Sequence, residues 1–161
     1  MIRLLLISCL LLLSACASRA PLPAQMPTLN LPQQLHIQRL QAGERQDWML
    51  VIQREQANLR WSLLDFLGIP QARQLLSDGT WQADGLLPPN PQARELFAAV
   101  LFALTPEAEL AGNYPGARQQ GQRRTLGERW QVIYEQPETF TVKLAQGLRY
   151  NVSPLPTEAT P

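Results

Sequence analysis

The residue types that most often carry out chemistry are rare in this sequence. His36 is the single histidine, and Cys9 and Cys16 are the two cysteines among 161 residues. One histidine cannot build the multi-histidine sites that bind zinc or copper. His36 also stands among alternating strand residues, with no nucleophile near it in the sequence that it could activate as a general base. The sequence therefore predicts no metal site and no catalytic role for His36.

The positions of the carboxylates do not indicate a catalytic site either. Asp65, Asp78 and Asp84 lie in or beside turn signals, where aspartate commonly accepts hydrogen bonds from local backbone groups. The sequence contains no glycine-rich phosphate loop, no nucleophile elbow and no pair of acids with hydrolase spacing. We therefore expect a protein that is not an enzyme and that uses no cofactor.

The N-terminus has the three parts of an export signal. A short basic start, residues 1–3 (MIR), precedes an apolar run at residues 4–13 and a stretch of small residues that ends at Cys16. About ten residues of helix span roughly 15 Å, which is half of the ~30 Å hydrocarbon core of a bilayer. The segment is therefore expected to direct export and to be removed, rather than to persist as a membrane helix.

Residues 13–16 (LSAC) resemble the lipobox of bacterial lipoproteins. The resemblance implies that the thiol of Cys16 receives a diacylglycerol, that the bond before Cys16 is cut, and that the new amine is acylated. Residues 6–9 (LISC) fit the same pattern, but cleavage before Cys9 would leave a signal of only eight residues. Ala17 stands where an aspartate would retain a lipoprotein in the inner membrane, which implies an anchor in the outer membrane, on its periplasmic face.

Composition and charge limit the class of protein. Hydrophobic residues make up 45% of the chain and charged residues 17%, as in globular domains. The 14 Lys+Arg residues nearly balance the 13 Asp+Glu residues, so the chain lacks the basic footprint of a protein that binds nucleic acid. We expect one folded domain and no nucleic-acid partner.

Proline content separates this domain from its flanks. Residues 17–34 contain four prolines and no periodic hydrophobic run. This pattern is typical of an extended tether, which could reach on the order of 50 Å from the lipid. The expected organisation is a signal peptide at 1–15, a lipidated cysteine and tether at 16–34, a domain at 35–153, and a flexible tail at 154–161.

Over most of the domain, hydrophobic residues recur with a period of two, which predicts strands. The expected strands lie at residues 35–41, 48–52, 59–63, 72–77, 130–134, 140–144 and 148–152, with a short apolar stretch near Trp81. Short connections between consecutive strands predict antiparallel meanders, and their apolar face must be covered.

The cover is expected to be one strongly apolar helix. Asn90 can cap its start, Pro91 suits the first helical position, and Pro106 ends it. Apolar residues occupy nearly the whole circumference between these points, so the helix must be buried on most sides or face something hydrophobic. The expected fold class is therefore α+β: an incomplete antiparallel β-barrel, formed by a curved sheet and covered by one or two helices.

A curved sheet roofed by such a helix can leave space for an acyl chain. The four tryptophans fall on strand faces, where they serve either as core fillers or as the lining of that cavity. The residues expected to bind a hydrophobic ligand are Trp48, Leu50, Trp61, Leu63, Phe97, Leu101, Trp130 and Tyr134.

A basic cluster follows the helix. It comprises Arg118, Arg123, Arg124 and Arg129, with glutamines between them. Such a cluster is typical of a solvated loop, and the alternative is that it contacts anionic lipid or lipopolysaccharide head groups.

The layout of residues 35–153 resembles the LolA/LolB group of periplasmic lipoprotein carriers and receptors. The resemblance rests on the order of elements, on residues 60–68 (RWSLLDFLG), on the helix at 94–104 and on residues 130–134 (WQVIY). It implies an incomplete barrel roofed by helices, with a hydrophobic cavity for acyl chains. A closer likeness is to a set of proteobacterial outer-membrane lipoproteins, and that likeness defines no activity.

The resemblance also singles out one loop. In LolB, which is itself an outer-membrane lipoprotein, an exposed leucine before a glycine in a strand-connecting loop assists delivery into the membrane. The matching position here is Leu67, which precedes Gly68 and follows Phe66. The apolar residues beside Gly68 and Pro70 either project into solvent or pack onto the core of the domain. The chain departs from the LolB pattern in its shorter length and in the residues Asp65 and Phe66 of this loop.

These observations predict an outer-membrane lipoprotein that binds or transfers an acylated or hydrophobic molecule in the periplasm: a lipoprotein, a lipid or a polyene lipid. Its expected partners are the outer membrane, reached through the N-terminal lipid, the acylated ligand, and a periplasmic carrier protein. The alternative is a structural or accessory lipoprotein that docks to an envelope assembly and carries no ligand.

Overall fold

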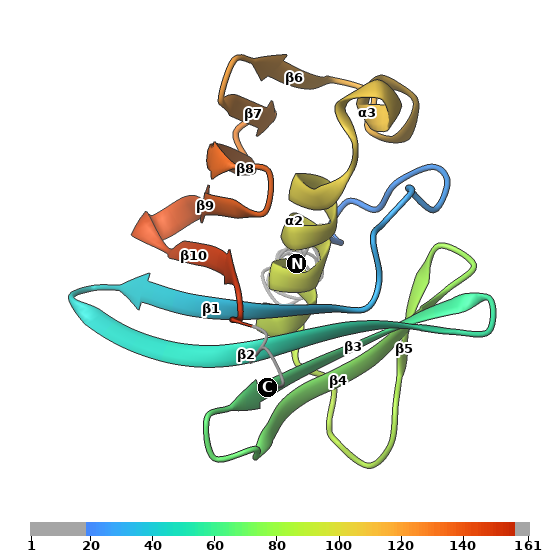
Figure 1. Ribbon diagram of the computed structural model, residues 1–161, viewed down its shortest axis with the longest axis vertical. Helices are drawn as coiled ribbons and strands as arrows, with labels where there is room; N and C mark the ends of the chain where they lie inside the picture. Colours follow the sequence, from blue (N-terminus) through green and yellow to red (C-terminus); the bar gives the residue numbers. More distant parts are fainter. Residues whose placement is uncertain (1–18, 157–161) are drawn as a thin grey trace, which may run out of the picture.

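The structure is a computed structural model that describes residues 19–156. The expected signal peptide at 1–15, the lipidation site Cys16 and residues 157–161 of the expected tail lie outside this range. Within it, ten strands form one open, curved antiparallel sheet that flanks two helices (Figure 1). The α+β class and the open, curved antiparallel sheet expected from the sequence are thereby confirmed.

The first half of the sheet is a meander in chain order. Its strands are β1 (Gln33–Gln41), β2 (Glu44–Glu55), β3 (Asn58–Asp65), β4 (Pro70–Ser77) and β5 (Thr80–Ala83). Each strand pairs with the next in antiparallel register, as the short connections predict. Side chains alternate between the two faces of a strand. The alternating apolar residues of β2 and β3 therefore all lie on the face that packs against the helix.

The second half is also a meander, and β1 joins it to the first. Its strands are β6 (Ala117–Gln120), β7 (Arg123–Leu126), β8 (Trp130–Gln136), β9 (Thr139–Lys143) and β10 (Arg149–Pro154). β10 pairs with β1, which gives the sheet order β5-β4-β3-β2-β1-β10-β9-β8-β7-β6. β5 and β6 are therefore the two open edges of the sheet.

The basic stretch expected to be a loop instead forms the hairpin of β6 and β7. These strands carry arginine and glutamine where the other strands carry apolar residues, so a period of two is not visible in them. Their place is set by pairing with β8, where Arg124 lies opposite Val132 and Leu126 opposite Trp130. The basic cluster is therefore mainly a feature of the sheet.

The helix α2 (Pro91–Leu104) lies between the two halves of the sheet (Figure 1). The Oδ1 atom of Asn90 accepts a hydrogen bond from Ala93 N at 3.0 Å, and Pro91 takes the first helical position, as predicted. α2 ends at Thr105, and the short helix α3 (Glu107–Asn113) follows. In residues 19–156, no helix is long and apolar enough to cross a membrane.

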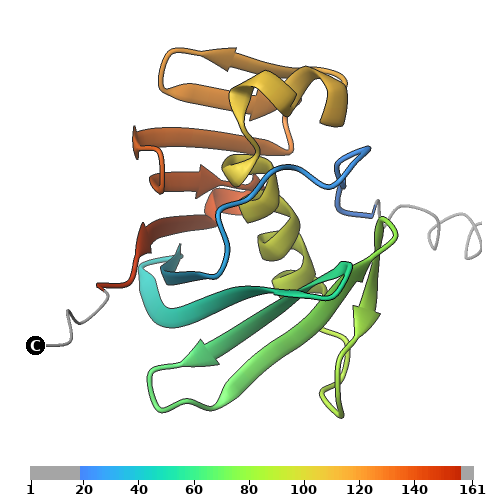
Figure 2. The ribbon, with the colours of Figure 1, turned by 45° about the vertical axis from the view of Figure 1, so that its right-hand side comes forward.

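The circumference of α2 is buried because an N-terminal segment completes its cover. We call residues 20–31 the strap; Figure 2 shows it passing across the side of α2 that the sheet leaves open. The strap residues that pack against the core are Ala20, Leu22, Leu29 and Leu31. Asn113 fastens the strap, since its backbone O accepts from Ala24 N at 3.0 Å and its Oδ1 from Gln25 N at 2.8 Å.

The strap revises the expectation of a free tether at 16–34. The described part of the segment, residues 19–32, contains neither helix nor strand, as its prolines predict, and the strap within it lies on the domain. β1 begins at Gln33 and β10 ends at Pro154, while Leu155 N donates to Gln34 O at 2.9 Å. The ordered domain is therefore wider than residues 35–153 at both ends.

Candidate functional site

Six of the eight residues expected to bind a hydrophobic ligand are core residues. The side chains exposed by 2% or less are those of Leu50, Trp61, Leu63, Phe97, Leu101 and Trp130. The rings of Trp61 and Phe97 are 5.5 Å apart between centroids, and those of Phe102 and Trp130 are also 5.5 Å apart. The structure therefore brings these six residues together as packed core around α2.

The other two residues, Trp48 and Tyr134, are half-buried and lie apart from each other. Trp48 lines a small recess of about 210 Å³ next to Gln46 and Gln71. Tyr134 lines a different pocket, of about 410 Å³, and its hydroxyl donates to Ala103 O at 2.6 Å. Burial raises the pKa of Tyr134 to about 12, so its hydroxyl stays protonated and continues to donate.

Beside the core lies a larger opening, which we call the rim cavity. It has a volume of about 470 Å³, within the range of roughly 300–1,000 Å³ that is usual for small-molecule pockets. The cavity lies between the strap, the edge strand β5 and the helix α2. Its lining residues are Arg19, Ala20, Leu22, Gly79, Thr80, Trp81, Pro91, Arg94 and Glu95.

Trp81 links the rim cavity to the aromatic core. Its ring centroid is 5.7 Å from that of Trp61 and 5.8 Å from that of Phe97. The indole N–H groups of Trp61 and Trp81 are buried, and neither has a hydrogen-bond partner among the described residues. α2 therefore meets this part of the sheet through aromatic contact, which is not directional in the way that hydrogen bonds are.

Polar bonds hold α2 to the other half of the sheet. Glu95 Oε2 accepts from Arg129 Nη2 at 2.7 Å, and Glu95 Oε1 accepts from Trp130 Nε1 at 2.7 Å. Arg124 is 4% exposed, and its Nη1 donates to the carbonyls of Phe102, Ala103 and Thr105 at 2.7 to 3.2 Å. Arg124 thus satisfies carbonyls at the end of α2, where a cation is also favoured by the helix dipole.

The role of Arg124 corrects the expectation of a solvated basic loop. Burial lowers the pKa of the Arg124 guanidinium from its ordinary value, yet arginine remains charged at any physiological pH. Of the four arginines in the cluster, Arg118 and Arg123 have exposed positions on β6 and β7. Only these two remain available for a head group on this surface, because Arg124 and Arg129 bind α2.

The loop between β3 and β4 presents apolar side chains to solvent, which is one of the two arrangements that the sequence left open. Phe66 is 60% exposed, Leu67 86% and Ile69 54%. Asp65 holds the loop in shape, since its Oδ1 accepts from Leu67 N and Ile69 N, each at 2.9 Å. Gly68 adopts a φ of +80°, which an L side chain rarely accepts. We call Phe66, Leu67 and Ile69 the first apolar tip.

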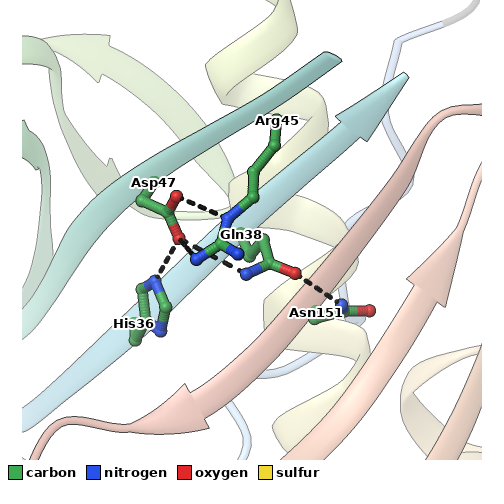
Figure 3. Close-up of polar contacts among 5 residues, drawn as sticks. All are labelled: His36, Gln38, Arg45, Asp47 and Asn151. Carbon is green, nitrogen blue, oxygen red and sulfur yellow. Dashed lines mark hydrogen bonds and ion pairs between the residues drawn. The ribbon is translucent and has the colours of Figure 1, made fainter. Parts of the chain in front are cut away.

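A polar network lies on the outer face of the sheet, across β10, β1 and β2 (Figure 3). His36 Nε2 is 2.8 Å from Asp47 Oδ1, and Arg45 Nε donates to Asp47 Oδ2 at 2.8 Å. Gln38 links Asp47, at 3.4 Å, to Asn151, at 3.0 Å. The hydrogen bond from Arg45, aided by those from His36 and Gln38, lowers the pKa of Asp47 to about 2. The Asp47 carboxylate therefore stays ionised and joins β1 to β2.

The network contains no hydrogen-bonded nucleophile. Ser153 stands opposite His36 in the register of β1 and β10, but Asp47 is the hydrogen-bond partner that the described chain gives to His36. The His36 ring instead meets Phe66 edge-on, with the centroids 5.6 Å apart. The network therefore braces the first apolar tip. In the part of the chain that the structure describes, no group of three or more His, Cys, Asp or Glu could hold a metal ion.

The rim cavity and the strap are the features that the sequence patterns miss. Trp81 was recognisable as part of a short apolar stretch, but its place beside the strap depends on contacts between residues about sixty positions apart. The strap itself carries apolar residues among its prolines, which is the only signal that could have indicated packing. In comparisons with known proteins, no family model matches this chain, and no curated protein matches it.

Proposed function

We propose that this protein is a lipoprotein anchored in the outer membrane that binds or transfers an acylated or hydrophobic molecule, in the manner of the LolB group. The observation that carries the proposal is the first apolar tip, a backbone-braced hairpin that exposes three large apolar residues at the end of a helix-filled half-barrel. An exposed group of this kind at a braced tip is typical of a surface that meets lipid or a partner. Burying one such side chain contributes about 1.5–3 kcal/mol, enough to orient the tip but too little to anchor the protein.

The rim cavity supplies a place for the acyl chain. Its apolar lining of Ala20, Leu22, Trp81 and Pro91 lies next to charged groups of Arg94 and Glu95 at the start of α2. Each methylene buried there would contribute about 0.8 kcal/mol. The ligand site proposed here therefore lies at the margin of the core, under the strap, rather than among the six core residues.

The strap also brings the proposed anchor close to this cavity. Arg19 lines the rim cavity, and it follows Cys16 by three positions. Even fully extended, three residues span only about 10–11 Å. A lipid on Cys16 would therefore leave the chain beside the rim cavity.

A second function is favoured by the filled interior. Since the core residues around α2 are exposed by 2% or less, the interior could serve only as a scaffold. In that case the protein is an accessory lipoprotein that docks to an envelope assembly and carries no ligand. A stoichiometric protein partner in cross-linked envelopes, together with no retained lipid, would support this alternative.

Binding is tested with a fluorescent fatty acid and the mature chain carrying Cys16→Ser. We expect saturable binding with a discrete stoichiometry. Trp81→Ala should weaken it by about tenfold or more, because an indole that packs on the chain is lost. Trp48→Ala is the matched control, since Trp48 is also half-buried on the first half of the sheet but does not line the rim cavity. No saturable binding, or equal losses in both variants, contradicts the proposed site.

Delivery is tested separately with Leu67→Glu. We expect thermal stability and fatty-acid binding close to those of the unmodified chain, because the Leu67 side chain makes little contact with the core. Transfer of the bound probe to acceptor vesicles should slow. Gln56→Glu adds the same charge in the exposed turn between β2 and β3, at the opposite end of β3, and should transfer normally. Equal transfer by both variants would remove the tip from the mechanism.

A further inference from the structure

A second exposed apolar residue lies in the connection between β5 and α2. Leu86 is completely exposed, and its neighbours in this connection are Gly85, the half-buried Leu87 and two prolines. Met26, Phe66, Leu67, Ile69 and Leu86 are the large apolar side chains that residues 19–156 expose. A single exposed leucine needs no explanation, but Leu86 is one of several exposed apolar residues.

Leu86 and the first apolar tip lie at the same end of the molecule. In both Figure 1 and Figure 2, the β3–β4 turn and the connection from β5 to α2 project from the lower end of the ribbon. We call Leu86 with its connection the second apolar tip. Four of the five exposed apolar side chains in the described chain therefore gather on two projections that point the same way.

The carboxylates next to both tips have partners within the fold. Asp84, just before the second tip, accepts from Arg60 Nε at 2.7 Å and pairs with Arg73 Nε at 3.0 Å. Asp65, just before the first tip, is occupied by the backbone N–H groups of its own turn. The second tip can therefore approach a medium of low dielectric constant with its neighbouring charge paired, and the first tip can do so with its neighbouring carboxylate hydrogen-bonded.

A polar recess separates the two tips. Gln71, two residues beyond the first tip, and Asn90, four residues beyond Leu86, line the same recess of about 210 Å³ with Gln46 and Gln92. A stable protein interface needs a continuous patch of about 800 Å² on each partner, which two apolar points flanking an amide-lined recess do not offer. A bilayer accepts separate insertions and hydrates the polar surface between them with its head groups.

We propose that the two apolar tips together form one contact surface for a lipid bilayer, with Leu86 as its second point of insertion. Two points of contact restrict the orientation of the domain relative to the membrane, whereas a single point leaves the domain free to rotate. The inference rests on the proposed function in one respect: it takes the first tip as a site that meets lipid. It adds a residue and an orientation that neither the sequence patterns nor the family resemblance indicate.

The test uses the lipidated full-length protein reconstituted in vesicles of phosphatidylethanolamine and phosphatidylglycerol. An environment-sensitive fluorophore is attached to Leu67→Cys, Leu86→Cys or the control Gln56→Cys, each an exposed position. Lipids with a nitroxide in the acyl chain then report whether each label enters the hydrocarbon. We expect quenching at positions 67 and 86 to be severalfold stronger than at position 56.

The outcomes separate this inference from the proposed function. A label at position 86 that stays in water while the label at 67 is quenched overturns the two-tip surface and leaves the first tip intact. Labels that both stay in water overturn the membrane role of the first tip as well. A label at 86 that loses water only when envelope protein is added, with no quenching by lipid, would assign the surface to a protein partner and overturn the proposal.

Discussion

The two halves of the sheet hold α2 by different kinds of interaction. The β6–β10 half uses directional bonds: Arg124 binds three carbonyls at the end of α2, and Glu95 accepts from Arg129 and Trp130. The β1–β5 half relies on aromatic packing, and a polar bond joins Arg94 Nε to Gln74 Oε1 at 3.2 Å. Directional bonds fix a helix in one position, whereas apolar surfaces lose less when they shift.

The rim cavity lies on the half that holds α2 by aromatic packing, whereas the pocket beside Tyr134, of about 410 Å³, lies on the half that holds it by polar bonds. The rim cavity lies on the β5 side of α2, where the strap and Trp81 close the structure without hydrogen bonds to the indole. A ligand that enters there needs to displace only apolar contacts and a strap held by a few backbone bonds. We therefore expect the β6–β10 half to stay fixed and a ligand to enter on the β1–β5 side.

The largest effect is expected for Arg124→Ala. The substitution removes a buried donor shared by the carbonyls of Phe102, Ala103 and Thr105, of which Ala103 O keeps the Tyr134 hydroxyl. We expect a loss of about 3 kcal/mol in the free energy of unfolding, measured by urea denaturation. The neighbouring exposed Arg123→Ala should change it by no more than about 0.5 kcal/mol. Equal effects would show that α2 is not fixed through Arg124.

A smaller effect separates the buried tryptophans of the two halves. Trp130→Phe and Trp61→Phe remove similar volume, but only Trp130 loses a hydrogen bond to a carboxylate. Trp130→Phe should therefore cost about 1–2 kcal/mol more in unfolding free energy than Trp61→Phe. If Trp61→Phe costs as much or more, the contrast between polar and apolar attachment is wrong.

Release of the strap is expected to cost less still. Asn113→Ala removes the side-chain oxygen that accepts from Gln25 N, at a cost of about 1 kcal/mol. Amide hydrogen exchange should accelerate in the strap while exchange in β8 and β9 stays unchanged. Faster entry of a fluorescent fatty acid should accompany it. Unchanged exchange in the strap would show that the Asn113 side chain does not fasten it.

The smallest effect concerns pH and Asp47. Its pKa of about 2 in the folded protein lies below its ordinary value of 3.8, so the folded state favours the carboxylate. This contribution to stability is fully present above about pH 4 and is lost as the pH falls through 2. Asp47→Asn should flatten the fall in unfolding free energy over that window by a small amount, because the side chain is partly exposed. An unchanged slope would contradict the role of the network.

Most of the fold could be predicted because its elements are locally encoded. Seven strands carry an alternating apolar pattern, and Asn90, Pro91 and Pro106 mark the ends of α2 by capping chemistry that needs no tertiary context. The hairpin of β6 and β7 could not be predicted in this way, because arginine and glutamine pair there through their backbones. The buried Arg124 is likewise invisible in sequence, since its acceptors lie about twenty residues away.

Within the candidate site, only properties of individual residues could be predicted from the sequence. The place of Leu67 beside Gly68 in a turn allowed either an exposed or a packed side chain, and the structure exposes it. The predicted ligand-binding residues share one apolar face. The alternating pattern does not distinguish residues that line a cavity from residues that fill a core, and the structure packs six of the eight in the core. Lipidation of Cys16 and a role in carrying an acylated molecule stay predictions, because Cys16 lies outside the described residues.

One measurement tests the opening of the β1–β5 side most directly. The indole N–H signals of the four tryptophans can be followed by NMR as a long-chain fatty acid is added to the mature chain carrying Cys16→Ser. We predict saturable shifts at Trp81 and Trp61, with the signal of Trp130 held in place by Glu95. Signals that do not move, or a shift at Trp130 as large as that at Trp81, would contradict a ligand site on the apolar side of α2.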